Sequence, residues 1–190
     1  MVNICLKSAA LIMKIVKTSL KDCIIIEPNY FGDERGFFME TFHLERYADL
    51  ANISIPFVQD NHSRSSKGVL RGLHFQKNKP QGKLVRVVSG VVYDVAVDIR
   101  PESSTFTEWE GVTLSEEHKK QFWVPPGFAH GFVVLSDYAD LEYKCTDFYD
   151  PSDEGIILWN DPDLNIQWPY EKPVLSEKDR YASKLVDLNL

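Results

Sequence analysis

The chain has 190 residues, of which 44% are hydrophobic and 26% charged, which suits one soluble globular domain with a proper core. The net charge of −7 argues against a nucleic-acid-binding surface, because such surfaces are usually basic. An anionic ligand would therefore need a local cluster of Arg and Lys side chains, since the field of the whole chain opposes it.

The first twelve residues are predicted to be a disordered lead-in or an upstream start, because Met13 offers a second start of translation. Their apolar piece is interrupted by Lys7 and is too short to span a bilayer. Cys5, Cys23 and Cys145 are odd in number and show no CxxC spacing, which indicates reduced thiols in a cytoplasmic protein. No repeat or linker divides the rest, so residues 13–190 are predicted to form a single domain.

Short β-type runs follow one another along the chain, separated by Gly, Pro, Asn and Asp. They cover residues 23–28, 36–42, 57–63, 69–76, 83–99, 108–114, 121–135, 139–149 and 155–159. Only residues 43–51 and 176–187 are predicted to be helical. Strands at this spacing indicate an antiparallel β-sandwich or jelly-roll barrel with a large inner pocket.

The run 83–99 shows the clearest alternation of side chains. One face carries Val91, Tyr93, Val95, Val97 and Ile99, and the other carries Asp94, Ala96 and Asp98. The dipeptide Ser89-Gly90 is a turn signal, and it predicts a hairpin between the two halves of the run.

Two later runs carry faces that mix aromatic, acidic and imidazole groups. One face holds Leu141, Tyr143, Cys145, Asp147 and Tyr149, and the other holds Phe128, His130, Phe132 and Val134. Such a mixture is more typical of a cavity wall than of a sealed core. The alternative is that both tyrosines cap the core with their hydroxyls in water.

The stretch "PPGFAHGF" matches the P-x-G-x-x-H pattern of metal-binding cupins. Such a metal site also needs H-x-H and a nearby Glu, but "LHFQKNKPQG" has one His and a Gln in place of the second. The ligand count fails, so we predict a metal-free pocket. His74 and His130 are then available for acid–base work or anion binding.

Four basic residues, Arg35, Arg71, Lys83 and Lys178, lie in or beside turn-like stretches. Each is either a solvated surface charge or, if all converge, part of a phosphate clamp. Arg71 and His74 raise a further question, because an odd separation puts them on opposite faces of a flat strand. A β-bulge at Gly72 would re-aim one of them.

Eight segments in order resemble the dTDP-4-dehydrorhamnose 3,5-epimerase family, from about Met13 to the end of the chain. They are "FGDERGFFMETF", "FVQDNHS", "VLRGLHFQ", "QGKLVRVVSG", "DVAVDIR", "WVPPGFAHGFVVLS", "YKCTDFYDPSDEGIILWNDP" and "LSEKD". The resemblance implies an all-β, cupin-type jelly roll with a few short peripheral helices. It also implies a homodimer with exchanged N-terminal strands and no metal or cofactor.

The resemblance implies conversion of dTDP-4-dehydro-6-deoxy-D-glucose to dTDP-4-dehydro-L-rhamnose. By motif, His74 is expected to be the catalytic base, Tyr143 the general acid, and Asp179 the carboxylate paired with the base. Lys83 is expected near the keto oxygen. Asp179 has a second possible role, because "SEKD" also reads as a helix capping box with Ser176 as N-cap.

Nucleotide and phosphate contacts are expected from Arg35, Glu40, Gln59, Asp60, Asn61, Arg71, His130, Glu154 and Lys178, with Tyr149 stacked on the thymine. Arg35 and Glu40 are expected to serve the partner subunit's site. Two alternatives stay open: an epimerase acting only at C3 or C5 of a related sugar, and a non-catalytic nucleotide-sugar-binding cupin. The sequence leaves open whether dTDP is preferred over UDP and which polysaccharide receives the sugar.

Overall fold

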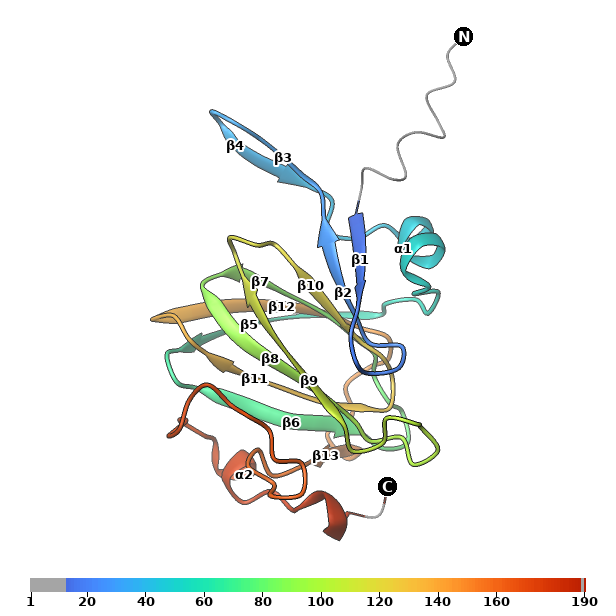
Figure 1. Cartoon of the computed structure of the whole chain (residues 1–190), viewed down its shortest axis with the longest axis vertical. Coiled ribbons are helices and arrows are strands. Elements are labelled where there is room, and N and C mark those ends of the chain that lie inside the picture. The colour runs from blue at the N-terminus through green and yellow to red at the C-terminus, as the bar shows by residue number, and fades with distance from the viewer. Residues whose placement is uncertain (1–12, 189) are drawn as a thin grey trace.

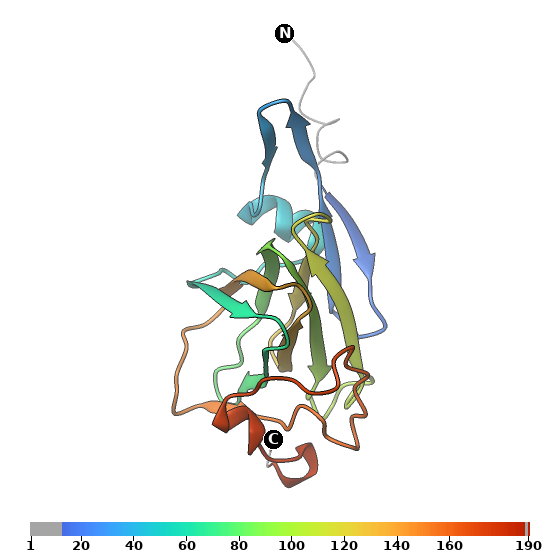
Figure 2. The same ribbon diagram turned by 90° about the vertical axis from the view of Figure 1, so that its left-hand side faces the viewer.

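Two antiparallel sheets lie face to face and form the body of the molecule (Figures 1 and 2). The computed structural model describes residues 13–188 and residue 190. The predicted lead-in over residues 1–12 lies outside them. The six-stranded sheet has the order β1 (Met13–Lys17), β2 (Ile24–Pro28), β10 (Gln121–Val124), β7 (Lys83–Ser89), β12 (Tyr138–Cys145), β5 (Gln59–Ser66).

The five-stranded sheet has the order β13 (Glu154–Ile156), β6 (Leu70–Gln76), β11 (Phe128–Val134), β8 (Val91–Asp98), β9 (Trp109–Ser115). A separate hairpin, β3 (Tyr30–Asp33) with β4 (Gly36–Met39), projects from the sandwich (Figure 1). The all-β jelly-roll prediction is confirmed, and every predicted run contains a strand. The strands β1 and β3 were not predicted.

The apolar core of the described residues falls into three clusters. The first lies between the sheets and joins side chains such as Val85 and Phe122 to Ala96 and Phe132. The second lies between the five-stranded sheet and the C-terminal segment, the third between the six-stranded sheet and α1 (Leu44–Ala51). Both sheets are therefore covered on their outer faces as well, at least in part.

The predicted hairpin at Ser89-Gly90 is wrong. The strands on either side of Gly90 belong to different sheets, because β7 pairs with β10 and β12 whereas β8 pairs with β11 and β9. Gly90 has a φ of +82°, and a Cβ there would lie 2.2 Å from the carbonyl oxygen of Tyr138. The chain thus turns a corner between layers at a residue that only glycine can occupy without strain.

The alternation in β8 is present, but both of its faces are buried. Val95 and Val97 pack toward the C-terminal segment, while Ala96 packs into the inter-sheet core. Asp94 and Asp98 are fully buried. The acidic face of this strand therefore points into the protein, where each carboxylate needs a partner.

Helix α1 begins after His43, whose ring accepts a hydrogen bond from the Arg46 backbone N–H at 3.4 Å, and ends at Asn52. The predicted helix over 176–187 is too long. Only α2 (Glu177–Arg180) and the 3-10 turn η2 (Leu185–Asp187) form, because Ser183 instead pairs with Ile157 in a β-bridge. No described helix is long and apolar enough to cross a membrane.

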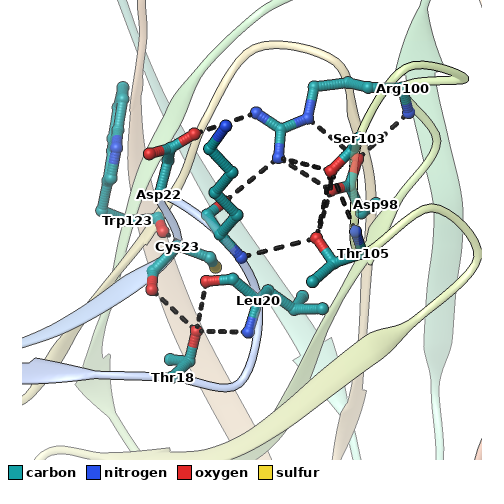
Figure 3. Close-up of polar contacts among 10 residues, drawn as sticks. Thr18, Leu20, Asp22, Cys23, Asp98, Arg100, Ser103, Thr105 and Trp123 are labelled. Atoms are coloured by element: carbon teal, nitrogen blue, oxygen red, sulfur yellow. Dashed lines mark hydrogen bonds and ion pairs between the residues drawn. The ribbon is translucent and has the colours of Figure 1, made fainter.

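Asp98 organises a polar network at the end of β8 (Figure 3). Its carboxylate accepts hydrogen bonds from Arg100 Nη2 at 2.7 Å, Ser103 Oγ at 2.6 Å and Thr105 Oγ1 at 2.7 Å. Arg100 continues the network to Asp22 at 3.2 Å, which ties the 99–108 loop to the β1–β2 connection. Burial raises the pKa of Asp98, but these hydrogen bonds outweigh it and bring the pKa to about 2.

We expect Asp98→Asn to destabilise the protein by about 3 kcal/mol at pH 7, because the charge-assisted bonds to Arg100 are lost. A lowered folded-state pKa contributes stability above the unfolded value near 3.9, and this contribution disappears as pH falls from about 4 to about 2. Urea unfolding at pH 7, 4 and 2.5, at fixed protein concentration, measures the difference in unfolding free energy between wild type and Asp98→Asn. Asp49→Asn, at an exposed position, is the control. A wild-type advantage that stays constant with pH would contradict this account.

Candidate active site

A cavity of about 600 Å³ opens between the sheets and is bordered by the C-terminal segment. Side chains from β5, β6, β7, β11 and β12 line it. Eleven of the predicted site residues meet there: Gln59, Asn61, Arg71, His74, Lys83, His130, Tyr143, Tyr149, Glu154, Lys178 and Asp179. The structure therefore brings together residues that lie up to 120 positions apart, although their roles stay predictions.

His74 and Asp179 form a close pair in this cavity. The His74 Nε2 and Asp179 Oδ1 atoms are 2.6 Å apart, and Asp179 is only 2% exposed. Burial raises the pKa of Asp179, but hydrogen bonds from His74 and Ser176 outweigh it and leave the pKa below its usual value. An ionised carboxylate on one ring nitrogen fixes the tautomer of His74 and stabilises the protonated ring.

Asp179 contacts His74 and also takes part in the N-terminal cap of α2. The backbone N–H of Asp179 donates to Ser176 Oγ at 3.2 Å, as in a helix N-cap, and the Ser176 hydroxyl donates to Asp179 Oδ2 at 2.7 Å. The cap thus fixes one carboxylate oxygen while the other meets His74. The short helix α2 holds the acid in place for the histidine.

Tyr143 and Lys83 line the same cavity from neighbouring strands. Tyr143 packs against the inter-sheet core, and burial raises the pKa of its hydroxyl. Lys83 is buried, which lowers the pKa of its ammonium group, and its Nζ donates to the carbonyl oxygen of His74 at 3.4 Å. The Tyr143 hydroxyl and the Lys83 side chain thus share one wall of the cavity with the histidine.

A β-bulge at Gly72 brings Arg71 and His74 to one face, as predicted. On β11, Phe132 opposes Arg71 and His130 opposes His74, so β6 has one extra residue between these pairs. Gly72 has a φ of +131°, and a Cβ there would lie 2.5 Å from the Cα of Gly131. Glycine is therefore required for both the conformation and the close approach of the strands.

Polar groups that sequence reasoning missed also lie here. Asp94 Oδ1 is 2.8 Å from His130 Nε2, so His130 has a buried acid partner as His74 does. Asp94 Oδ2 and Ser63 Oγ are buried without a partner among the described residues, and Ser63 lines the cavity. Alternation assigns Asp94 to one face of β8 and Ser63 to one face of β5. The sequence does not show which of the two faces is the interior.

Three of the four predicted clamp cations, Arg71, Lys83 and Lys178, reach the cavity wall. Arg71 Nε donates to Ser65 Oγ at 3.0 Å, and Lys178 Nζ is paired with Glu154 at 2.8 Å. Their charges provide local attraction for an anion in a chain that is acidic overall.

Three predicted residues do not line this cavity. Arg35 is exposed at the tip of the β3–β4 hairpin and pairs with Asp33, and Glu40 pairs with Arg46. Asp60 lies on the other face of β5, where it pairs with Lys144 at 3.0 Å, because its neighbours Gln59 and Asn61 take the inward positions. The described part of the chain contains no cluster of three His, Cys, Asp or Glu side chains that could hold a metal ion.

Comparison with known proteins agrees with this geometry. The family model for dTDP-4-dehydrorhamnose 3,5-epimerase matches residues 17–187. The enzyme of that name from Salmonella typhimurium is 55% identical over 175 residues, covering 91% of this chain and 96% of that protein. A dTDP-4-dehydrorhamnose 3-epimerase from Streptomyces niveus is less similar, at 38% over 163 residues, 85% of this chain and 79% of that protein.

Among solved structures, the dTDP-6-deoxy-D-glucose-3,5-epimerase of Legionella pneumophila, in complex with dTDP-4-keto-L-rhamnose, superimposes with a TM-score of 0.91. It is 56% identical, and the match covers 93% of this chain and 95% of that chain. This chain therefore belongs to the dTDP-4-dehydrorhamnose 3,5-epimerase family.

Proposed function

We propose that this chain is a dTDP-4-dehydrorhamnose 3,5-epimerase, which inverts C3 and C5 of dTDP-4-dehydro-6-deoxy-D-glucose. The observation that carries the proposal is the pairing of His74 with buried Asp179, in a cavity that Tyr143 and Lys83 also line. Family membership over nearly the whole chain supports it. We expect the enzyme to act in the cytoplasm, as one domain over residues 13–190.

The 4-keto group of this sugar acidifies the C–H bonds at C3 and C5, because the carbanion delocalises onto the ketone as an enolate. His74 takes the proton, since an imidazole can accept one near neutral pH and Asp179 stabilises the charged ring. Lys83 stabilises the developing oxyanion, a contribution that can reach roughly 3 kcal/mol per donor.

Tyr143 returns a proton to the opposite face of the carbon. Its raised pKa keeps the hydroxyl protonated, so it is available as a donor. The cations Arg71 and Lys178 hold the diphosphate, and Tyr149 at the rim stacks on the base. Gln59, Asn61, His130 and Glu154 complete the nucleotide-sugar contacts.

A second candidate is an epimerase acting at one carbon only, as the name of the Streptomyces niveus relative states for that protein. The identity to 3,5-epimerases is higher, at 55% against 38%, which favours inversion at both carbons. Incubating the protein with the substrate in D₂O and reading the product by NMR separates the candidates. Deuterium at both C3 and C5 supports the proposal, and deuterium at one carbon supports the second candidate. No exchange at either carbon supports a non-catalytic binding module.

The β3–β4 hairpin supports a homodimer. The hairpin projects from the body of the chain (Figure 1). It exposes four aromatic side chains, Tyr30, Phe31, Phe37 and Phe38. Exposed apolar groups in this number mark an interaction surface. We propose that the hairpin reaches a second copy and brings Arg35, and with it Glu40, to the partner subunit's cavity.

The first prediction of this proposal separates His74 from Tyr143. His74→Ala should abolish deuterium exchange at both carbons, because enolate formation begins each half-reaction. Tyr143→Phe should keep exchange but lose inversion by 10²–10⁴-fold, about 3–5 kcal/mol, because reprotonation from the histidine side returns the starting configuration.

Deuterium wash-in and product stereochemistry are followed together, with exposed Tyr138→Phe on the same strand as control. Equal loss of exchange in both variants, or inversion by His74→Ala, would refute the assigned roles.

The second prediction concerns the hairpin. Arg35→Ala and His74→Ala homodimers should each be impaired, the first in nucleotide binding and the second in chemistry. Random mixing of the two chains should restore about a quarter of the wild-type sites, because mixed dimers hold one intact site. The turnover rate after subunit exchange measures the fraction of sites restored. If mixtures show only the average of the two parents, Arg35 does not act across the interface.

A further inference from the structure

Gln76 stands where a metal-binding cupin would have the second histidine of its H-x-H pair, and the proposed mechanism does not use it. Its side chain is only 5% exposed and lines the cavity beside His74. A buried amide must satisfy two N–H donors and one carbonyl acceptor, so its partners indicate what it does.

Among the described residues, every hydrogen-bond partner of the Gln76 amide is a backbone group. Its Nε2 donates to the carbonyl oxygen of Lys79 at 2.8 Å and to that of Phe148 at 3.2 Å. Its Oε1 accepts from the backbone N–H of Asp150 at 2.8 Å. One side chain thus joins the loop after β6 to the segment after β12, and it contacts the residues on both sides of Tyr149.

Two further glutamines hold the same segment. Gln59 Oε1 accepts from the backbone N–H of Tyr149 at 2.9 Å, and Gln81 Nε2 donates to the carbonyl oxygen of Asp147 at 2.7 Å. The backbone of residues 147–150 is therefore bound by side chains from β5, β6 and the loop before β7. Gln76 makes two of these four contacts and also binds the carbonyl oxygen of Lys79, so it is the central anchor.

The aromatic rings of this segment are only partly packed. Phe148 is 64% exposed and Tyr149 is 48% exposed. A ring with little packing is placed by its backbone, and pre-ordering it reduces the entropy cost of binding a flat ligand. The glutamine contacts therefore fix the backbone from which the Tyr149 ring reaches the rim of the cavity.

We propose that Gln76 is a positioning residue for recognition of the nucleobase: it holds Tyr149 in place to stack on the base. The inference rests on the proposed function, in which Tyr149 meets the base. Glutamine suits the task because one planar amide supplies both donors and the acceptor. A neutral histidine has one donor, and an ionised glutamate has none.

The test compares two probes, thymidine diphosphate and inorganic pyrophosphate, by calorimetry on the full-length protein. Gln76→Met keeps the shape and removes the three hydrogen bonds. We expect it to weaken thymidine diphosphate binding by about 10-fold and pyrophosphate binding by less than about 2-fold. KM for the nucleotide sugar should rise in parallel, with kcat within about 3-fold of wild type, and exposed Gln167→Met serves as control.

A double-mutant cycle tests whether Gln76 affects binding through Tyr149. If Gln76 acts through Tyr149, then Gln76→Met combined with Tyr149→Ala should bind thymidine diphosphate no more weakly than Tyr149→Ala alone, within about 2-fold. Gln76→Leu also removes the three hydrogen bonds and adds no charge to the cavity, so it should show the same selective loss. This second variant replaces Gln76→Met in both measurements if Gln76→Met does not fold.

The outcomes separate this inference from the function on which it rests. If Tyr149→Ala weakens both probes equally, the base site of the proposed function is misplaced. If Tyr149→Ala is selective but the Gln76 variants bind like wild type, or lose pyrophosphate as strongly as thymidine diphosphate, only the role of Gln76 is overturned. Additive losses in the double mutant would also overturn it.

Discussion

The hydrogen bond between His74 and Asp179 joins residues 105 positions apart, and the architecture of the site depends on it. His74 comes from β6, between β13 and β11 in the five-stranded sheet, whereas Asp179 comes from one helical turn near the end of the chain. The contact requires the C-terminal segment to pack on the sheet, which its apolar side chains achieve through Leu164, Ile166 and Leu185. The packing of that segment therefore places the carboxylate against the histidine, and the cap at Ser176 orients it.

The interior of the sandwich serves two purposes at once. One part is sealed by close-packed apolar side chains, and the other is lined by charged and hydroxyl groups around the cavity. Every buried charge there must find a partner, because an unpaired one costs far more than a hydrogen bond contributes. The buried carboxylates of Asp179 and Asp94 meet this demand through His74 and His130. Burial in the cavity wall raises the pKa of Tyr143 and lowers that of Lys83.

Binding at the rim depends on backbone anchoring more than on packing. The three glutamines Gln59, Gln76 and Gln81 bind a segment whose aromatic rings stay accessible to a ligand. Gln76 was visible in the sequence only as a missing metal ligand. Its partners Lys79, Phe148 and Asp150 could not be predicted, because hydrogen bonds to backbone groups leave no pattern in residue types.

Residue order alone determined the all-β class, the position of α1 and most strands, since alternation and turn residues are local properties. The family motifs also indicated eleven residues that share one cavity. Tertiary structure alone decided that Gly90 is a corner between sheets and not a hairpin turn, and that residues 176–187 break into two turns. It also decided that Asp60 faces away from the cavity and that Asp94 faces inward. In each case a strand's pattern shows that two faces differ, but only the packing of the opposite layer determines which face is the interior.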